Sequence, residues 1–119
     1  DKAQRPVREL ESANLYELPY GETLSSVDAR CHDVSMAQMI ANCVRQVLRC
    51  DAVVINSGTV RGNKQYSDTI SYGDLKQECP FSSEMIVVVM PFSVLRQGVA
   101  FSRTPWREAE QGHRAKREH

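Results

Sequence analysis

The sequence predicts an α/β fold, in which a short mixed sheet is covered by helices. The sheet is expected around residues 52–56 and 85–90, because both contain continuous apolar runs rich in β-branched residues, as buried strands do. Residues 35–49 carry apolar side chains at three- and four-residue steps, which is the spacing of one helix face. Strand-like and helix-like segments that alternate along one chain are typical of an α/β layer.

Before the first apolar run, the sequence predicts secondary structure weakly in residues 1–20 and clearly only in the helix at 35–49. Residues 1–20 mix charges with scattered Leu and Tyr, and only a short strand near residues 16–18 is expected there. Turn-forming residues and a polar loop follow to about residue 33. The helix over 35–49 then begins with Ser35 as a candidate N-cap.

In the second half of the chain, the residues that begin and end helices are easier to recognise. Ser71 followed by Asp74 is an acidic variant of the capping box and predicts a short helix through Gln77, which Pro80 ends. The second predicted strand follows at 85–90. After it, Pro91 opens a predicted helix that runs to Phe101.

The 119 residues suit one domain, which we place at residues 1–101. Residues 102–119 are charged and carry little core material besides Trp106, so we expect a charged helical or disordered tail there. Because the chain begins without Met, we expect a mature form or a piece of a longer protein. It shows no targeting segment, so its localisation stays open.

Composition and charge exclude several classes of partner. The 15 basic and 15 acidic side chains give a formal net charge of zero, so no overall field attracts nucleic acid, and none is expected as a partner. The longest apolar run, residues 85–90, is far shorter than the roughly 20 residues that span a bilayer. We therefore expect no membrane span.

Cysteine and histidine spacing indicates no metal site. The four cysteines form no CxxC pair, and we expect most to be free thiols, with Cys43 on the apolar side of its helix. The three histidines fall outside any metal-binding pattern. No cofactor is therefore expected in this chain.

The loop after the first predicted strand carries the most chemistry. Asn56 can donate and accept hydrogen bonds, Gly58 lets a ligand approach the backbone, and Arg61 can form a bidentate bond to a phosphate or a diol. Ligands of open α/β sheets bind at such carboxyl ends of strands. The alternative is that Asn56 and Gly58 only make the turn and Arg61 is a solvated surface charge.

Several motifs together resemble the C-terminal domain of the 5'-nucleotidase family over about residues 18–101. They are Gly21-Glu22-Thr23-Leu24, Arg30-x-x-Asp33, Asn56-x-Gly58-x-x-Arg61, the run from Thr69 to Leu75, and Pro80-Phe81. The resemblance implies that Arg30, Asn56 and Arg61 hold ribose hydroxyls and polar groups of a nucleotide, and that Phe81 stacks on the base. The alternative for Phe81 is a core aromatic residue.

The resemblance also implies what this chain does not do. In the family a separate N-terminal metallophosphatase domain holds two divalent metals, so we expect a metallophosphatase domain in the parent chain and no catalytic residues here. The family's second stacking aromatic has no counterpart unless Trp106 replaces it. The predicted function is nucleotide or nucleoside recognition, not catalytic by itself, and nucleotide catabolism is the implied process. The alternative is a structural or protein-interaction module without a ligand site.

Overall fold

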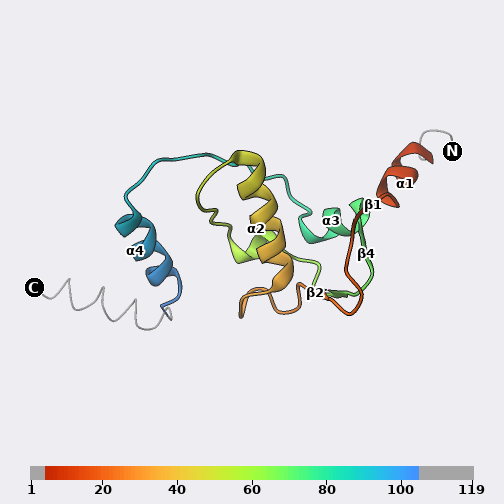
Figure 1. Cartoon of the computed structure of the whole chain (residues 1–119), viewed down its shortest axis with the longest axis horizontal. Coiled ribbons are helices and arrows are strands. Elements are labelled where there is room, and N and C mark those ends of the chain that lie inside the picture. Colours follow the sequence, from red (N-terminus) through yellow and green to blue (C-terminus); the bar gives the residue numbers. More distant parts are fainter. Residues whose placement is uncertain (1–4, 105–119) are drawn as a thin grey trace, which may run out of the picture. The chain divides into compact units, whose positions relative to one another are not determined.

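The computed structural model describes residues 5–104, which divide into two units at Met85 and Ile86. The first unit holds most of the regular structure (Figure 1). In chain order its elements are α1 (Arg5–Glu11), β1 (Asn14–Glu17), β2 (Leu24–Ser25), α2 (Ser35–Leu48), a 3-10 turn η1 (Ser57–Thr59), β3 (Gln65–Tyr66), β4 (Thr69–Ser71) and α3 (Tyr72–Glu78).

The strands form two antiparallel pairs, β1 with β4 and β2 with β3. In the first pair Tyr16 lies opposite Ile70, and in the second Leu24 lies opposite Tyr66. Helices and short strands thus share one small unit, and the α/β class predicted from the sequence is confirmed.

A small apolar cluster joins these elements. Met36 at the start of α2, Val60 after η1, Tyr66 in β3 and Ile70 in β4 are buried against one another. Partly buried side chains from the β1 end, β2 and α2 surround them. The core therefore fixes the start of α2 to the segment that follows η1.

Helix α2 confirms the predicted range, with two local differences. Ser35 is its first helical residue and not the N-cap, and its Oγ accepts a hydrogen bond from the Ser25 amide at 2.8 Å. The helix ends where Arg49 adopts a left-handed φ of 52°. Cys43 lies on the same side of the helix as Met39, with 3.9 Å between their sulfur atoms, but it is exposed, because the core reaches only the first turns of this helix. All four cysteines are free, as expected.

The capping box at α3 is confirmed. Ser71 Oγ accepts from the Asp74 amide at 3.1 Å, and Asp74 Oδ2 accepts from the Ser71 amide at 3.0 Å. These two bonds satisfy backbone donors that the first turn of a helix otherwise leaves without partners. The helix continues to Glu78, one residue beyond the predicted end.

The two strands predicted at 52–56 and 85–90 are wrong. Within residues 5–104 neither segment takes part in strand pairing, and most of their apolar side chains are exposed. A β-branched run favours extended backbone, but a strand also needs hydrogen-bonded neighbours, and the described strands pair only among themselves. The sheet is accordingly two antiparallel pairs and not one mixed sheet.

The second unit contains α4 (Phe92–Ser102). This helix confirms the one predicted to run from Pro91 to Phe101. Pro91 is its N-cap and has extended backbone angles. The tail beyond residue 104, with Trp106, lies outside the described residues. No helix among residues 5–104 has both the length and the apolar character needed to cross a membrane.

Candidate functional site

A cavity of about 450 Å³ lies between two segments of the first unit, a volume in the usual range of small-molecule sites. Segment 26–31 forms one wall and segment 60–63 forms the other. The residues that line it are Ser26, Asp28, Ala29, Arg30, Cys31, Val60, Arg61 and Asn63.

The pairing of β2 with β3 brings these walls together. Ser25, the last residue of β2, lies opposite Gln65, the first residue of β3, so the chain after β2 runs beside the chain before β3. The Ser26 amide then donates to the Lys64 carbonyl oxygen at 2.9 Å. Farther along, the Asp28 amide donates to Asn63 Oδ1 at 3.0 Å and joins the two walls a second time.

The turn in the first wall depends on Asp28. Its φ of 54° is left-handed, a region that Asp and Asn enter more readily than most residues. Its carbonyl oxygen accepts from the Cys31 amide at 2.8 Å. This turn carries Arg30 to the cavity, and the Arg30 guanidinium makes no hydrogen bond or ion pair among the described residues.

Arg61 is held by three contacts. Its amide donates to the Glu78 carbonyl oxygen at 2.8 Å, and its Nε donates to the Gly58 carbonyl oxygen at 2.8 Å. The guanidinium carbon lies 4.8 Å from the centroid of the Phe81 ring, within cation–π distance. Its two terminal nitrogens form no hydrogen bond within residues 5–104 and remain available to a ligand.

Asn56 and Gly58 make the turn that holds Arg61. Asn56 Oδ1 accepts from the Gly58 amide at 3.1 Å and caps η1. The turn-forming role considered as the alternative for these residues is therefore present. Neither residue lines the cavity.

Phe81 does not line the cavity either, although it contacts Arg61. Its side chain is 65% exposed, so the alternative of a core aromatic residue is wrong. Of the five residues predicted from the sequence, the structure thus brings Arg30 and Arg61 to one cavity and connects the other three to it through Arg61.

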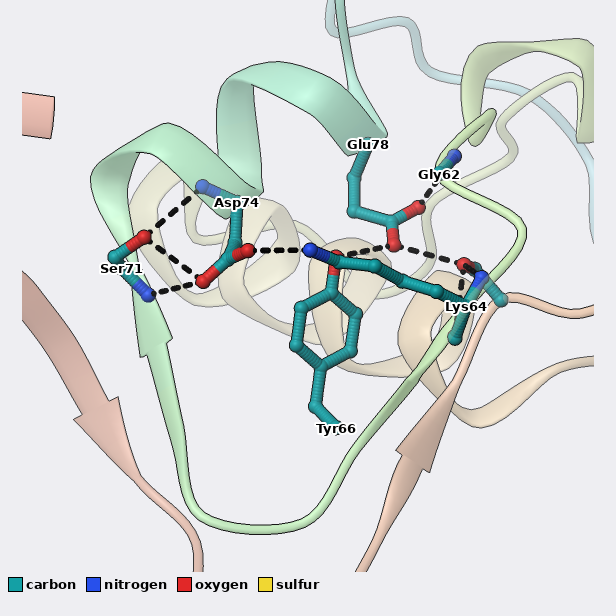
Figure 2. Close-up of polar contacts among 7 residues, drawn as sticks. Gly62, Lys64, Tyr66, Ser71, Asp74 and Glu78 are labelled. Carbon is teal, nitrogen blue, oxygen red and sulfur yellow. Dashed lines mark hydrogen bonds and ion pairs between the residues drawn. The ribbon is translucent and has the colours of Figure 1, made fainter. Parts of the chain in front are cut away.

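A buried carboxylate connects both walls to α3 (Figure 2). Glu78 is fully buried; its Oε1 accepts from the Ser26 and Tyr66 hydroxyls, both at 2.7 Å, and its Oε2 accepts from the Gly62 amide at 2.9 Å. Burial and the neighbouring Glu78 carboxylate both raise the pKa of Tyr66, so the phenol stays a donor.

Lys64 connects this carboxylate cluster to the capping box, as Figure 2 shows. Its Nζ lies 2.6 Å from Asp74 Oδ1 and 4.7 Å from the Tyr66 ring centroid. Burial would raise the pKa of Asp74, but hydrogen bonds from Lys64 and Ser71 outweigh it, and the pKa is lowered. Asp74 is therefore a carboxylate at neutral pH.

Sequence reasoning missed Ser26, Asp28, Asn63 and Glu78. The Gly62-Asn63 pair is a turn signal that could have directed attention to the second wall. Glu78 carries no such signal, because a glutamate near the end of a short helix usually faces solvent. Only the fold shows that it is buried.

The described residues do not fit a metal centre. Among residues 5–104, no group of three or more His, Cys, Asp or Glu side chains could hold a metal ion.

Comparisons with known proteins identify the family of this chain. The family model described as 5'-nucleotidase, C-terminal domain, matches residues 12–115, which include both walls of the cavity. No curated protein and no solved structure matched the chain. The match covers most of the sequence, and the chain belongs to the 5'-nucleotidase C-terminal domain family.

Proposed function

We propose that the cavity between segments 26–31 and 60–63 binds a nucleotide or nucleoside, as the recognition part of a 5'-nucleotidase-type hydrolase. The observation that carries this proposal is that Arg30 and Arg61, distant in sequence, line one cavity of about 450 Å³. Membership of the family supports it, because the family is described as the C-terminal domain of 5'-nucleotidase.

The chemistry of the lining suits such a ligand. A guanidinium presents parallel N–H groups that match a phosphate or a pair of ribose hydroxyls, and both arginines keep terminal nitrogens available. Asp28 adds a carboxylate that can accept from a sugar hydroxyl. Because the whole chain has a formal net charge of zero, attraction to a phosphate is local to this pair of arginines.

Phe81 supplies a surface for the base. The Arg61 guanidinium lies over its ring, yet 65% of the side chain remains exposed. A base stacked there would adjoin a phosphate or sugar held at Arg61, and stacking of this kind contributes about 1–3 kcal/mol per base.

We assign recognition and not hydrolysis to this chain. The resemblance to the family implies that a separate N-terminal domain carries two divalent metals and the hydrolytic chemistry. Incubation of the chain with AMP and added Mg²⁺, Mn²⁺ or Zn²⁺ should release no phosphate above the buffer control. Metal-dependent release that copurifies with the folded chain would contradict this assignment.

The binding test is an NMR titration of the labelled chain with AMP and adenosine up to about 10 mM, which detects millimolar dissociation constants. Amide shifts are expected at residues 28–31 and 58–63. Arg61→Ala should remove most of the response, and Arg61→Lys should not restore it, because an ammonium cannot form the two parallel hydrogen bonds. Arg45→Ala is the matched control, since it removes one positive charge from a residue that does not line the cavity.

The outcomes separate binding from a second role. Absence of shifts at the highest concentration would refute nucleotide recognition and favour the structural or protein-interaction module. Equal responses in the wild-type and Arg61→Ala chains would place the ligand outside this cavity.

A further inference from the structure

We propose that Glu78 is the positioning residue of the cavity, which joins its two walls so that Arg30 and Arg61 face the same ligand. This inference rests on the proposed nucleotide site and adds a residue that does not line it. The carboxylate contacts Ser26 in the first wall, and in the second it contacts Gly62, between Arg61 and Asn63.

The contacts of Glu78 divide between the walls. Oε1 accepts from Ser26 Oγ and Oε2 from the Gly62 amide, while the main-chain oxygen of Glu78 accepts from the Arg61 amide. Ser26 Oγ in turn accepts from the Lys64 amide at 3.0 Å. Glu78, the last residue of α3, therefore forms hydrogen bonds with both walls of the cavity.

Gly62 lies too close to the Glu78 carboxylate for any side chain to fit between them. A Cβ atom added at Gly62 would overlap the carboxyl group of Glu78, so no other residue fits there without displacing it. The absence of a side chain at 62 thus permits the close approach that the hydrogen bond requires. A substitution at Gly62 perturbs the same contact from the opposite side.

A carboxylate suits this position because both of its oxygens accept hydrogen bonds and three donors surround it. Within residues 5–104 no Lys or Arg forms an ion pair with Glu78, so its burial is compensated by three hydrogen-bond donors. A glutamine has one acceptor oxygen and one donor-only nitrogen. Glu78→Gln can accept from the Gly62 amide only with its nitrogen toward the Ser26 and Tyr66 hydroxyls, which would then have to turn and accept from it, so the two bonds that these hydroxyls donate to residue 78 would be lost.

Loss of this contact should weaken binding without removing any group that touches ligand. Arg30 and Arg61 would remain, but their walls would no longer be held in one arrangement before binding. Ordering them on binding then costs conformational entropy, which lowers affinity.

The test uses Glu78→Gln and Gly62→Ala in the whole chain, singly and together, with Ile70→Val as a control. Ile70 is buried in the apolar core with Tyr66, does not line the cavity and has no side-chain donor for Glu78, so its substitution reports simple loss of stability. The ligand-independent readout is hydrogen exchange at the Asp28 amide, whose acceptor is Asn63 in the opposite wall. The ligand readout is AMP affinity by NMR.

In Glu78→Gln we expect the Asp28 and Gly62 amides to exchange hydrogen about tenfold faster than in the wild type, while amides in the middle of α2 exchange at the wild-type rate. This pattern would show a local opening of the cavity walls and not unfolding of the helix. AMP affinity should fall about fivefold through this lost pre-organisation. Gly62→Ala should give the same pattern, and the double variant should be no worse than either single variant, because both changes break one contact. Ile70→Val should speed hydrogen exchange at the Asp28 amide and at the α2 amides by the same factor, because it lowers only the overall stability.

Each failure has its own signature. Wild-type exchange at Asp28 in both Glu78→Gln and Gly62→Ala would overturn the positioning role, whatever AMP does. AMP binding unchanged in Glu78→Gln despite faster exchange would overturn its importance for the ligand. A wild-type chain that does not bind AMP would instead refute the proposed function, and with it the ligand half of this inference.

Discussion

Removal of one hydroxyl group tests whether the buried Glu78 carboxylate holds the first unit together. Tyr66→Phe keeps the aromatic ring in the core and beneath Lys64, and it deletes only the phenol that donates to Glu78 Oε1 at 2.7 Å. The raised pKa of Tyr66, caused by burial and by the carboxylate, fits a phenol that stays protonated as a donor.

The expected cost follows from the type of bond. A hydrogen bond to a charged acceptor contributes about 1.5–3 kcal/mol, more than one between neutral groups. Glu78 would keep two donors, the Ser26 hydroxyl and the Gly62 amide, so the carboxylate would not become unsatisfied. We therefore expect Tyr66→Phe to lower the free energy of unfolding by about 2 kcal/mol.

Urea unfolding measures this loss. With a slope of about 1–3 kcal/mol per molar urea, the midpoint should fall by about 1 M at an unchanged slope. Tyr20→Phe is the matched control, because Tyr20 is fully exposed and its hydroxyl has no partner among the described residues. If both variants unfold at the same urea concentration as the wild type, the Tyr66 hydroxyl does not stabilise this fold and the reasoning is wrong.

Two further predictions concern α3 and its surroundings. Ser71→Ala removes the hydroxyl of the capping box and should lower stability by about 1 kcal/mol in thermal unfolding followed by circular dichroism, whereas an unchanged midpoint would mean that the box is not formed in solution. Stability should also depend on pH at both extremes, as urea midpoints across pH would show. The lowered pKa of Asp74 gives stability that is present above its ordinary value of 3.8 and lost as the pH falls below it. Burial raises the pKa of Cys79 and of Tyr66, so their contributions are lost as the pH rises above the ordinary values of 9.0 for the thiol and 10.0 for the phenol. A midpoint that is constant across both ranges would contradict these pKa directions.

The helices were predictable because their signals are local. The apolar spacing of α2 and the Ser71–Asp74 capping box each lie within one segment, so no distant contact is needed to specify them. Helix α1 (Arg5–Glu11) was missed because its residues show no clear helical periodicity.

The short strand expected near residues 16–18 overlaps β1 (Asn14–Glu17), but β2 and β3 were not predictable, for the opposite reason. A strand exists only through its partner, and β2 and β3 are two residues each, too short to carry a pattern. Their pairing nevertheless places segment 26–31 beside segment 60–63 and so creates the cavity. Sequence reasoning could name Arg30 and Arg61 from a family resemblance, but it could not supply Glu78, whose burial depends on that pairing.

Asn56 is the residue for which the family-implied role and the structural role lead to different results. The resemblance implies that its amide contacts the ligand, whereas here its Oδ1 accepts from the Gly58 amide and thereby fixes the turn that holds Arg61. Asn56→Asp separates the two, because aspartate keeps the acceptor oxygen and loses the donor. Adenosine is the suitable probe, since an added carboxylate would repel the phosphate of AMP. If the turn is what matters, Asn56→Asp should bind adenosine as the wild type does, while Asn56→Ala should lose about 1 kcal/mol, or about fivefold in affinity. Equal losses in both variants, with the Gly58 amide still protected from exchange in Asn56→Asp, would instead assign the Asn56 amide to the ligand.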